Sequence, residues 1–149
     1  MSLKLVQFLA IILTALALVP GAAHLLALSN KIALAQEPYF IAQNIYRGWA
    51  LLGIVIVAAL VADIVLAWMQ RGQGTPFTLA LAAALCLAAT LVIFFAWTFP
   101  ANQATSNWTT APANWDVLRR QWEVSHAVNA VVTFVALCAV TLSVLVARK

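Results

Sequence analysis

Charged residues are scarce in this 149-residue chain: 8% of the residues are Asp, Glu, Lys or Arg, whereas 65% are hydrophobic. The mean hydropathy of +1.00 excludes a soluble domain, whose surface needs many more polar groups. The chain has only two cysteines and two histidines, and their spacing matches neither a disulfide framework nor a recognised metal site. The net charge of +4 comes from cations flanking apolar runs, so we expect contact with anionic lipid headgroups rather than nucleic acid.

Four apolar stretches are long enough to cross a bilayer as helices, which takes roughly 20 residues. They cover residues 5–28, 49–69, 77–97 and 127–146. The sequence therefore predicts one all-α domain over 1–149, a four-helix transmembrane bundle with two long loops on one side. The first stretch exceeds the roughly 7–15 apolar residues of a signal peptide, so we interpret it as a retained helix. Both a monomer and an oligomer remain open.

Loop lengths and cations predict the orientation. The connection over 70–76 is short, whereas those over 29–48 and 98–125 are long, so both termini should share a side with the short connection. That side carries only cations: Lys4, Arg71, Arg148 and Lys149. The opposite side carries an equal number: Lys31, Arg47, Arg119 and Arg120. Function could have placed Arg119 and Arg120, so these two cations count less toward topology. The positive-inside rule then favours cytoplasmic termini. We expect the membrane to be a bacterial inner membrane.

Three residues inside the predicted helices are unusual for a lipid-facing position. A carboxylate such as Asp63 costs roughly 2.5–3.5 kcal/mol at the centre of a bilayer, so we predict that Asp63 faces the bundle. Its role is either an interhelical hydrogen bond or a proton or ion pathway. Cys86 and Cys138 are predicted to be small packing residues, because a buried thiol usually behaves as one.

A polar and aromatic stripe leads into the fourth predicted helix. Its members recur at steps of three and four, the spacing of one helical face: Trp115, Arg119, Trp122, His126, Asn129 and Thr133. This spacing predicts that the fourth helix extends outward to about Trp115, without a break between Trp122 and His126. A face of this composition does not suit lipid, so it predicts a bound ligand or a docked loop.

The predicted topology places both histidines at the same end of the bundle. At 1.5 Å per residue, His24 and His126 should lie within roughly 10 Å of the long-loop surface, where Asn102 also falls. Simpler interpretations exist for each group. His24 would bond a carbonyl released at Pro20, and His126 and the tryptophans would be ordinary interfacial residues. Along the fourth helix, Arg119 would pair with Asp116 or Glu123.

The last third of the chain resembles a known family. Residues Pro100, Asn102, Trp108, Asn114-Trp115, Arg119, Trp122 and His126 resemble the anthrone oxygenase-like family of small four-helix membrane proteins. The resemblance implies oxidation of a small hydrophobic, phenolic or polyketide-like substrate by O2 without a cofactor. The residue a turn after the histidine is often basic in that family, whereas here it is Asn129.

The residues permit a mechanism of that type. A phenolic substrate would stack between Trp115 and Trp122, with Trp108 and His24 also binding it. His126 would remove a proton as the base, with His24 as the second candidate for that role, and Arg119 and Asn102 would stabilise the resulting oxyanion.

Two other functions remain open from the sequence. A redox protein would use His24 and His126 as the two axial ligands of a haem. A non-catalytic transport or partner-binding module would use the long loops as its contact surface.

Overall fold

The computed structural model describes residues 2–147 and shows an all-α protein. Its helices are α1 (Leu3–Ile32), α2 (Gln36–Gln43), α3 (Gly53–Met69), α4 (Thr75–Ile93), α5 (Phe99–Ala104) and α6 (Trp115–Leu145). Two short 3-10 turns, η1 (Asn44–Tyr46) and η2 (Trp49–Leu52), lead into α3, and a π-helical segment, η3 (Phe94–Thr98), joins α4 to α5. The predicted four-helix bundle is therefore confirmed.

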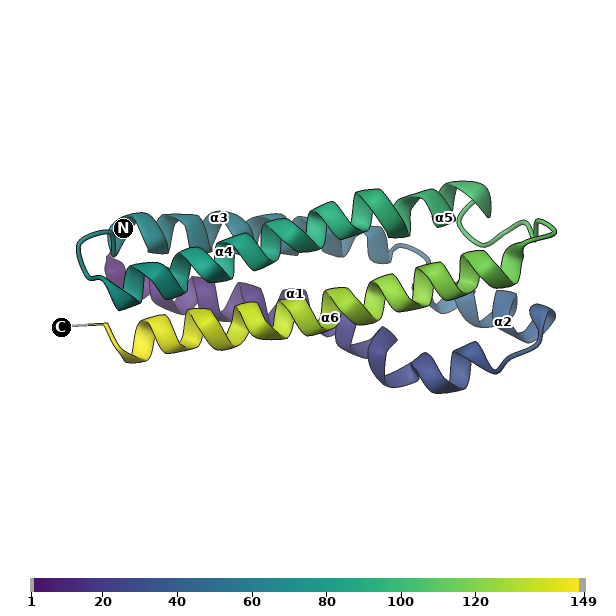
Figure 1. Cartoon of the computed structure of the whole chain (residues 1–149), viewed down its shortest axis with the longest axis horizontal. Helices are drawn as coiled ribbons and strands as arrows, with labels where there is room; N and C mark the ends of the chain where they lie inside the picture. Colours follow the sequence, from purple (N-terminus) through teal and green to yellow (C-terminus); the bar gives the residue numbers. More distant parts are fainter. Residues whose placement is uncertain (1, 148–149) are drawn as a thin grey trace.

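Four helical spans are long and apolar enough to cross a membrane: Leu3–Ile32, Trp49–Met69, Thr75–Ala104 and Trp115–Leu145. They run side by side, with the two ends of the chain and the α3–α4 turn at one end of the bundle (Figure 1). The other end carries α2, α5 and the loop before α6. We call it the long-loop end: residues 24–52 and 94–126. Length and composition thus make the chain an integral membrane protein.

The predicted extension of the fourth helix is confirmed, because α6 begins at Trp115 and continues unbroken past His126. Two other helices are longer than predicted. α1 continues to Ile32, beyond the expected end at residue 28, and the third span runs through η3 and α5 to Ala104. The additional turns are polar, so a hydropathy pattern ends before the helical backbone does.

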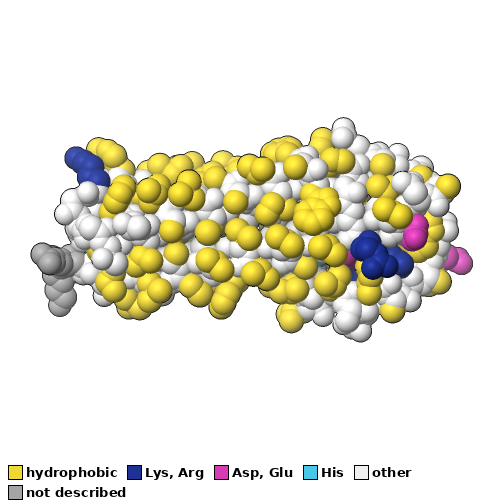
Figure 2. Space-filling model, in the orientation of Figure 1, with side chains coloured by type: hydrophobic (Ala, Val, Ile, Leu, Met, Phe, Trp, Pro, Cys, Tyr) yellow, Lys and Arg dark blue, Asp and Glu magenta, His cyan; other side chains and the backbone are white. Residues whose placement is uncertain are grey.

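Small residues hold the half of the bundle nearest the termini together. α1 and α4 both pack against α6 and α3, and alanines fill much of the buried surface: Ala10, Ala17, Ala59, Ala80, Ala83 and Ala136. Such residues let helix backbones approach closely in a membrane. Large apolar side chains such as Phe8, Leu85 and Leu145 are exposed instead. Figure 2 shows hydrophobic side chains covering the middle of the bundle and charged ones near its ends, as a lipid-embedded surface requires.

A close helix contact lies next to the two histidines. A Cβ atom added to Gly21 on α1 would lie 3.2 Å from Ala130 Cα and 3.3 Å from Ala130 Cβ on α6. Only a residue without a side chain fits this approach without displacing the neighbour. His24 and His126 lie one turn further toward the long-loop end, so this contact brings the two histidines together.

The buried polar residue of α3 points inward, as predicted. Asp63 is fully buried, and Thr14 Oγ1 on α1 donates a hydrogen bond of 3.4 Å to Asp63 Oδ2. The other carboxyl oxygen has no partner within residues 2–147. Both cysteines are free thiols; Cys86 is half-buried, but Cys138 is exposed, so the predicted packing role is wrong for Cys138.

The loop before α6 has an unusual backbone. Ser106, Asn107 and Trp108 have φ values of 50°, 56° and 64°, in the left-handed region that residues other than glycine rarely adopt. Thr105 anchors the turn, because its Oγ1 accepts a hydrogen bond of 3.1 Å from Trp108 N and its carbonyl accepts one of 3.0 Å from Thr109 N. The turn leads the chain back toward α6 and buries the Trp108 side chain.

Candidate functional site

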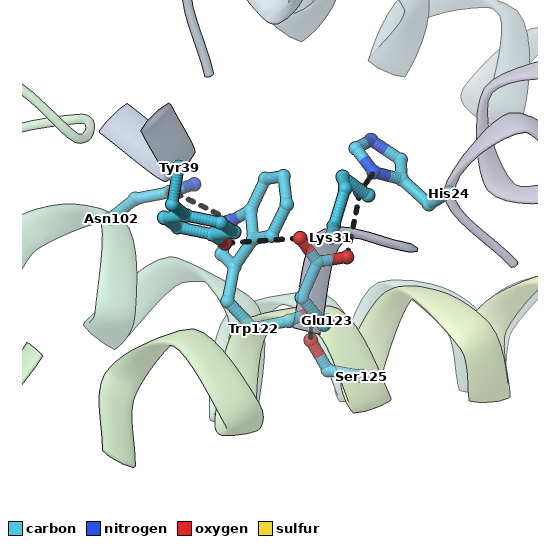
Figure 3. A network of polar contacts seen from close by, with 7 residues as sticks. All are labelled: His24, Lys31, Tyr39, Asn102, Trp122, Glu123 and Ser125. Atoms are coloured by element: carbon cyan, nitrogen blue, oxygen red, sulfur yellow. Dashed lines mark hydrogen bonds and ion pairs between the residues drawn. The ribbon is translucent and has the colours of Figure 1, made fainter. Parts of the chain in front are cut away.

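A buried ion pair joins α1 to α6 at the long-loop end. Lys31 Nζ, in the last turn of α1, lies 2.7 Å from Glu123 Oε2 on α6, and the two side chains are 7% and 0% exposed. The same ammonium lies 2.9 Å from His24 Nδ1, two turns earlier on the same face of α1. Figure 3 shows Lys31 between the imidazole and the carboxylate. A buried pair of this kind depends on satisfying every donor and acceptor around it.

The short helix α2 completes this network. Tyr39 on α2 is fully buried, and its hydroxyl donates a hydrogen bond of 3.0 Å to Glu123 Oε1. Burial, together with the neighbouring Glu123 carboxylate, raises the pKa of the Tyr39 phenol well above its ordinary value of 10.0. Tyr39 therefore stays a protonated donor to Glu123 through neutral pH. We call these four residues, His24, Lys31, Tyr39 and Glu123, the buried polar network.

The two histidines stack on each other beside the buried polar network. The ring centroids of His24 and His126 are 4.1 Å apart, with an angle of 20° between the planes. The Trp122 ring meets both edge-on, at 4.8 Å from His24 and 4.4 Å from His126. Tyr46 lies 4.2 Å from His24 on another side. The two imidazoles thus lie within an aromatic enclosure, the histidine pair site.

Trp122 is held by hydrogen bonds from two directions. Its Nε1 donates a bond of 2.7 Å to Asn102 Oδ1 on α5, and its carbonyl accepts one of 2.8 Å from Ser125 Oγ. The hydroxyl of Thr98 in η3 lies 2.7 Å from Ser125 Oγ, so the π-helical segment supports the same turn of α6. Trp108 lies edge-on to Trp122 at 5.5 Å, which covers the site from the loop.

Arg119 and Trp115 pack around Tyr39 rather than against the two histidines. The Arg119 guanidinium lies 4.6 Å from the Trp115 ring centre and 5.4 Å from that of Tyr39, and it donates to the carbonyl of Leu34. The predicted ion pair of Arg119 with Asp116 or Glu123 is wrong: within residues 2–147 neither carboxylate lies within ion-pair distance of Arg119, and Glu123 pairs with Lys31. Arg119 instead fixes the turn between α1 and α2.

The structure thus brings together part of the predicted site. His24, His126 and Trp122 lie in mutual contact, and Asn102 and Trp108 contact Trp122. Trp115 and Arg119 contact Tyr39 and Leu34 instead of the histidines. His24 Nδ1 bonds Lys31, rather than a carbonyl released at Pro20 as the simpler interpretation expected.

The sequence does not predict Lys31, Tyr39 or Glu123 as site residues, and it places Tyr46 at the long-loop end without a role. Lys31 carried a signal, because it follows His24 by seven residues and therefore shares its helical face. Its position beside an apolar run equally suits a topology-determining cation. Tyr39 carried no local signal, since its position depends on how α2 folds back over α6.

The orientation of the two histidines can be compared with the one that a bis-histidine haem requires. Two histidines that bind one iron from opposite sides must point their nitrogens at each other across the macrocycle. His24 and His126 are stacked face to face, which leaves no plane for a porphyrin between them, so these residues do not fit a bis-histidine haem. Within residues 2–147, no three side chains of His, Cys, Asp or Glu are grouped to hold a metal ion.

Comparisons with known proteins add no assignment. No protein-family model, curated protein or solved structure matches this chain.

Proposed function

We propose that the histidine pair site oxidises an electron-rich phenolic molecule, dissolved in the membrane, with O2 and without a cofactor. The observation that carries the proposal is the stack of His24 and His126 inside an aromatic enclosure at the long-loop end. A planar aromatic substrate would pack against the outside of this cluster, whose rings leave no space between them, because aromatic rings favour offset-stacked or edge-on contacts. The resemblance to the anthrone oxygenase-like family points to the same chemistry.

His126 is the base in this proposal. Within residues 2–147 its imidazole has ring contacts but no hydrogen-bond partner, whereas His24 Nδ1 is occupied by Lys31. An imidazole suits proton abstraction at neutral pH. It would take a proton from an activated CH2 group, and the carbanion would add to O2 and, on protonation, give a hydroperoxide. Loss of water leaves a carbonyl, so CH2 and O2 become C=O and H2O.

The experiment measures oxygen uptake by the purified protein, in detergent, with an anthrone as substrate. Because a general base typically contributes about 10²- to 10⁴-fold to the rate, His126→Ala should lose turnover by that factor. Trp68→Phe is the matched control, since Trp68 is exposed at the opposite end of the bundle. Undiminished uptake by a folded His126→Ala protein would eliminate His126 as the base. A folded wild type that consumes no O2 would favour a non-catalytic, partner-binding module.

We also propose that both termini are cytoplasmic. Lys31 and Arg119, two of the cations at the long-loop end, are held by buried or local contacts, so the site accounts for their position. Lys4 and Arg71 at the other end are exposed, as topology-determining cations should be. Arg148 and Lys149 lie outside the described residues. Fluorescence of a C-terminal green fluorescent protein fusion would support this orientation, and activity of a C-terminal alkaline phosphatase fusion would contradict it.

A further inference from the structure

The contacts of Lys31 determine which nitrogen of His24 can carry a proton. An ammonium group has three hydrogen-bond donors and no acceptor. Lys31 Nζ lies 2.9 Å from His24 Nδ1, so Nδ1 must accept, and a neutral imidazole then carries its proton on Nε2. The Glu123 carboxylate lies 2.7 Å from the same ammonium and forms an ion pair with it. Tyr39 donates to the other oxygen of Glu123, so both carboxyl oxygens of Glu123 have a partner.

We propose that Lys31 fixes His24 as the Nε2–H tautomer, and that this N–H donates a hydrogen bond to an anionic oxygen of the ligand. The ligand class is a phenolate or enolate. The second half of the proposal rests on the proposed function, whereas the tautomer depends only on the contacts of the buried polar network. Lys31 is thus a positioning residue, and His24 is the group that touches the ligand.

The position of the His24 ring supports this role. Figure 3 shows the second ring nitrogen on the side of the imidazole away from Lys31. His24 also stacks on His126, so a donor lies beside the base. A donor at that position stabilises the negative charge that develops when the base removes the proton. Arg119 and Asn102, the donors expected from the sequence, instead bond Leu34 and Trp122.

Nitrogen NMR of the histidines measures the tautomer without any enzymatic assay. The chain has two histidines, so His126→Gln leaves a single imidazole to assign in protein labelled with [15N]histidine. We expect the wild-type protein to show His24 with a protonated Nε2 and an unprotonated, hydrogen-bonded Nδ1. An Nδ1–H tautomer or an imidazolium at neutral pH would overturn the proposal.

Removing Lys31 tests the cause of the tautomer. Because Lys31→Met alone leaves the Glu123 carboxylate unpaired, the variant of choice is the double change Lys31→Met/Glu123→Gln, which keeps an acceptor for Tyr39. We expect this protein to show a mixture of both His24 tautomers. Arg120→Met is the matched control, since it removes an exposed cation from the same end and should leave the Nε2–H form unchanged. A pure Nε2–H form in the double variant would refute Lys31 as the cause.

A bound phenol tests the donor role. The probe is 1,8-dihydroxyanthraquinone, a product analogue that cannot be oxidised at the reacting carbon, and its binding is followed by quenching of tryptophan fluorescence. We expect the probe to shift the His24 Nε2–H resonance. In the oxygen-uptake assay, His24→Phe should lose about 10²- to 10³-fold in kcat, as removal of an oxyanion donor does, and His24→Gln, which keeps an N–H, should lose less.

The outcomes separate the two proposals. A wild-type protein that consumes no O2 but binds the probe and shifts the Nε2–H resonance would refute the oxygenase and support the donor. A bound probe that leaves this resonance unmoved would refute the donor whatever the activity.

Discussion

The buried ion pair between Lys31 and Glu123 gives the sharpest test of how the long-loop end is held. Removing one partner of a buried ion pair typically costs about 3–5 kcal/mol, because the other charge is left uncompensated. Glu123 is fully buried and Lys31 is 7% exposed, so Lys31→Met should destabilise the protein by that amount. Glu123→Gln should also be costly, since the ammonium then lacks a counter-charge.

The double variant Lys31→Met/Glu123→Gln should be more stable than either single variant. No charge remains unpaired in it, and the glutamine oxygen can still accept from Tyr39. The remaining cost is the loss of the donor to His24 Nδ1, about 1–3 kcal/mol for a stranded buried acceptor. The double variant should therefore lose much less free energy of unfolding than the sum of the losses in the two single variants.

Reversible unfolding in mixed detergent micelles, followed by circular dichroism, measures all four free energies of the cycle. The control is Asp116→Asn/Arg120→Met, which removes two exposed charges from α6, the helix that carries Glu123. This double change should alter the free energy of unfolding by no more than about 1 kcal/mol. If the effects of Lys31→Met and Glu123→Gln simply add, the two side chains do not form the ion pair that the structure shows.

Three further predictions concern other contacts. Asp63→Asn should melt at a higher temperature than Asp63→Leu, because an amide keeps a bond to Thr14 whereas leucine strands that hydroxyl; equal melting temperatures would count against the bond. Gly21→Val should cost about 1–3 kcal/mol through overpacking against Ala130, and adding Ala130→Gly should recover part of it; no recovery would place the clash elsewhere. The stability that Tyr39 contributes should be full below pH 10.0, its unfolded pKa, and fall above it, since burial raises the folded pKa. A melting curve for Tyr39→Phe with the same alkaline slope as the wild type would contradict this.

Hydropathy predicted the number and order of the spans because lipid exposure demands apolar side chains along a whole helix. It missed the last turn of α1 and all of α5 because those turns are polar while their backbones remain helical. Spacing located the outer end of α6 at Trp115 because the stripe keeps its period of three and four across the change from polar to apolar residues.

The histidine pair was predictable because antiparallel helices of known length place His24 and His126 at similar depth. Their partners were not. A rule based on spacing along one helix pairs Arg119 with Glu123, whereas Tyr39, 84 residues away in the sequence, bonds that carboxylate. The docking of α2 decides which side chain bonds the Glu123 carboxylate. That docking depends on contacts between distant segments, which no local pattern encodes.

The left-handed turn before α6 affects how firmly the histidine pair site is covered. For residues other than glycine this conformation costs roughly 1–2 kcal/mol each, and Ser106, Asn107 and Trp108 all adopt it. The hydrogen bonds at Thr105 and the burial of the Trp108 ring against Trp122 offset this strain. Displacing the loop releases the strain as it exposes the indole. Uncovering Trp122 therefore costs less free energy than the burial of Trp108 and the hydrogen bonds at Thr105 would together suggest.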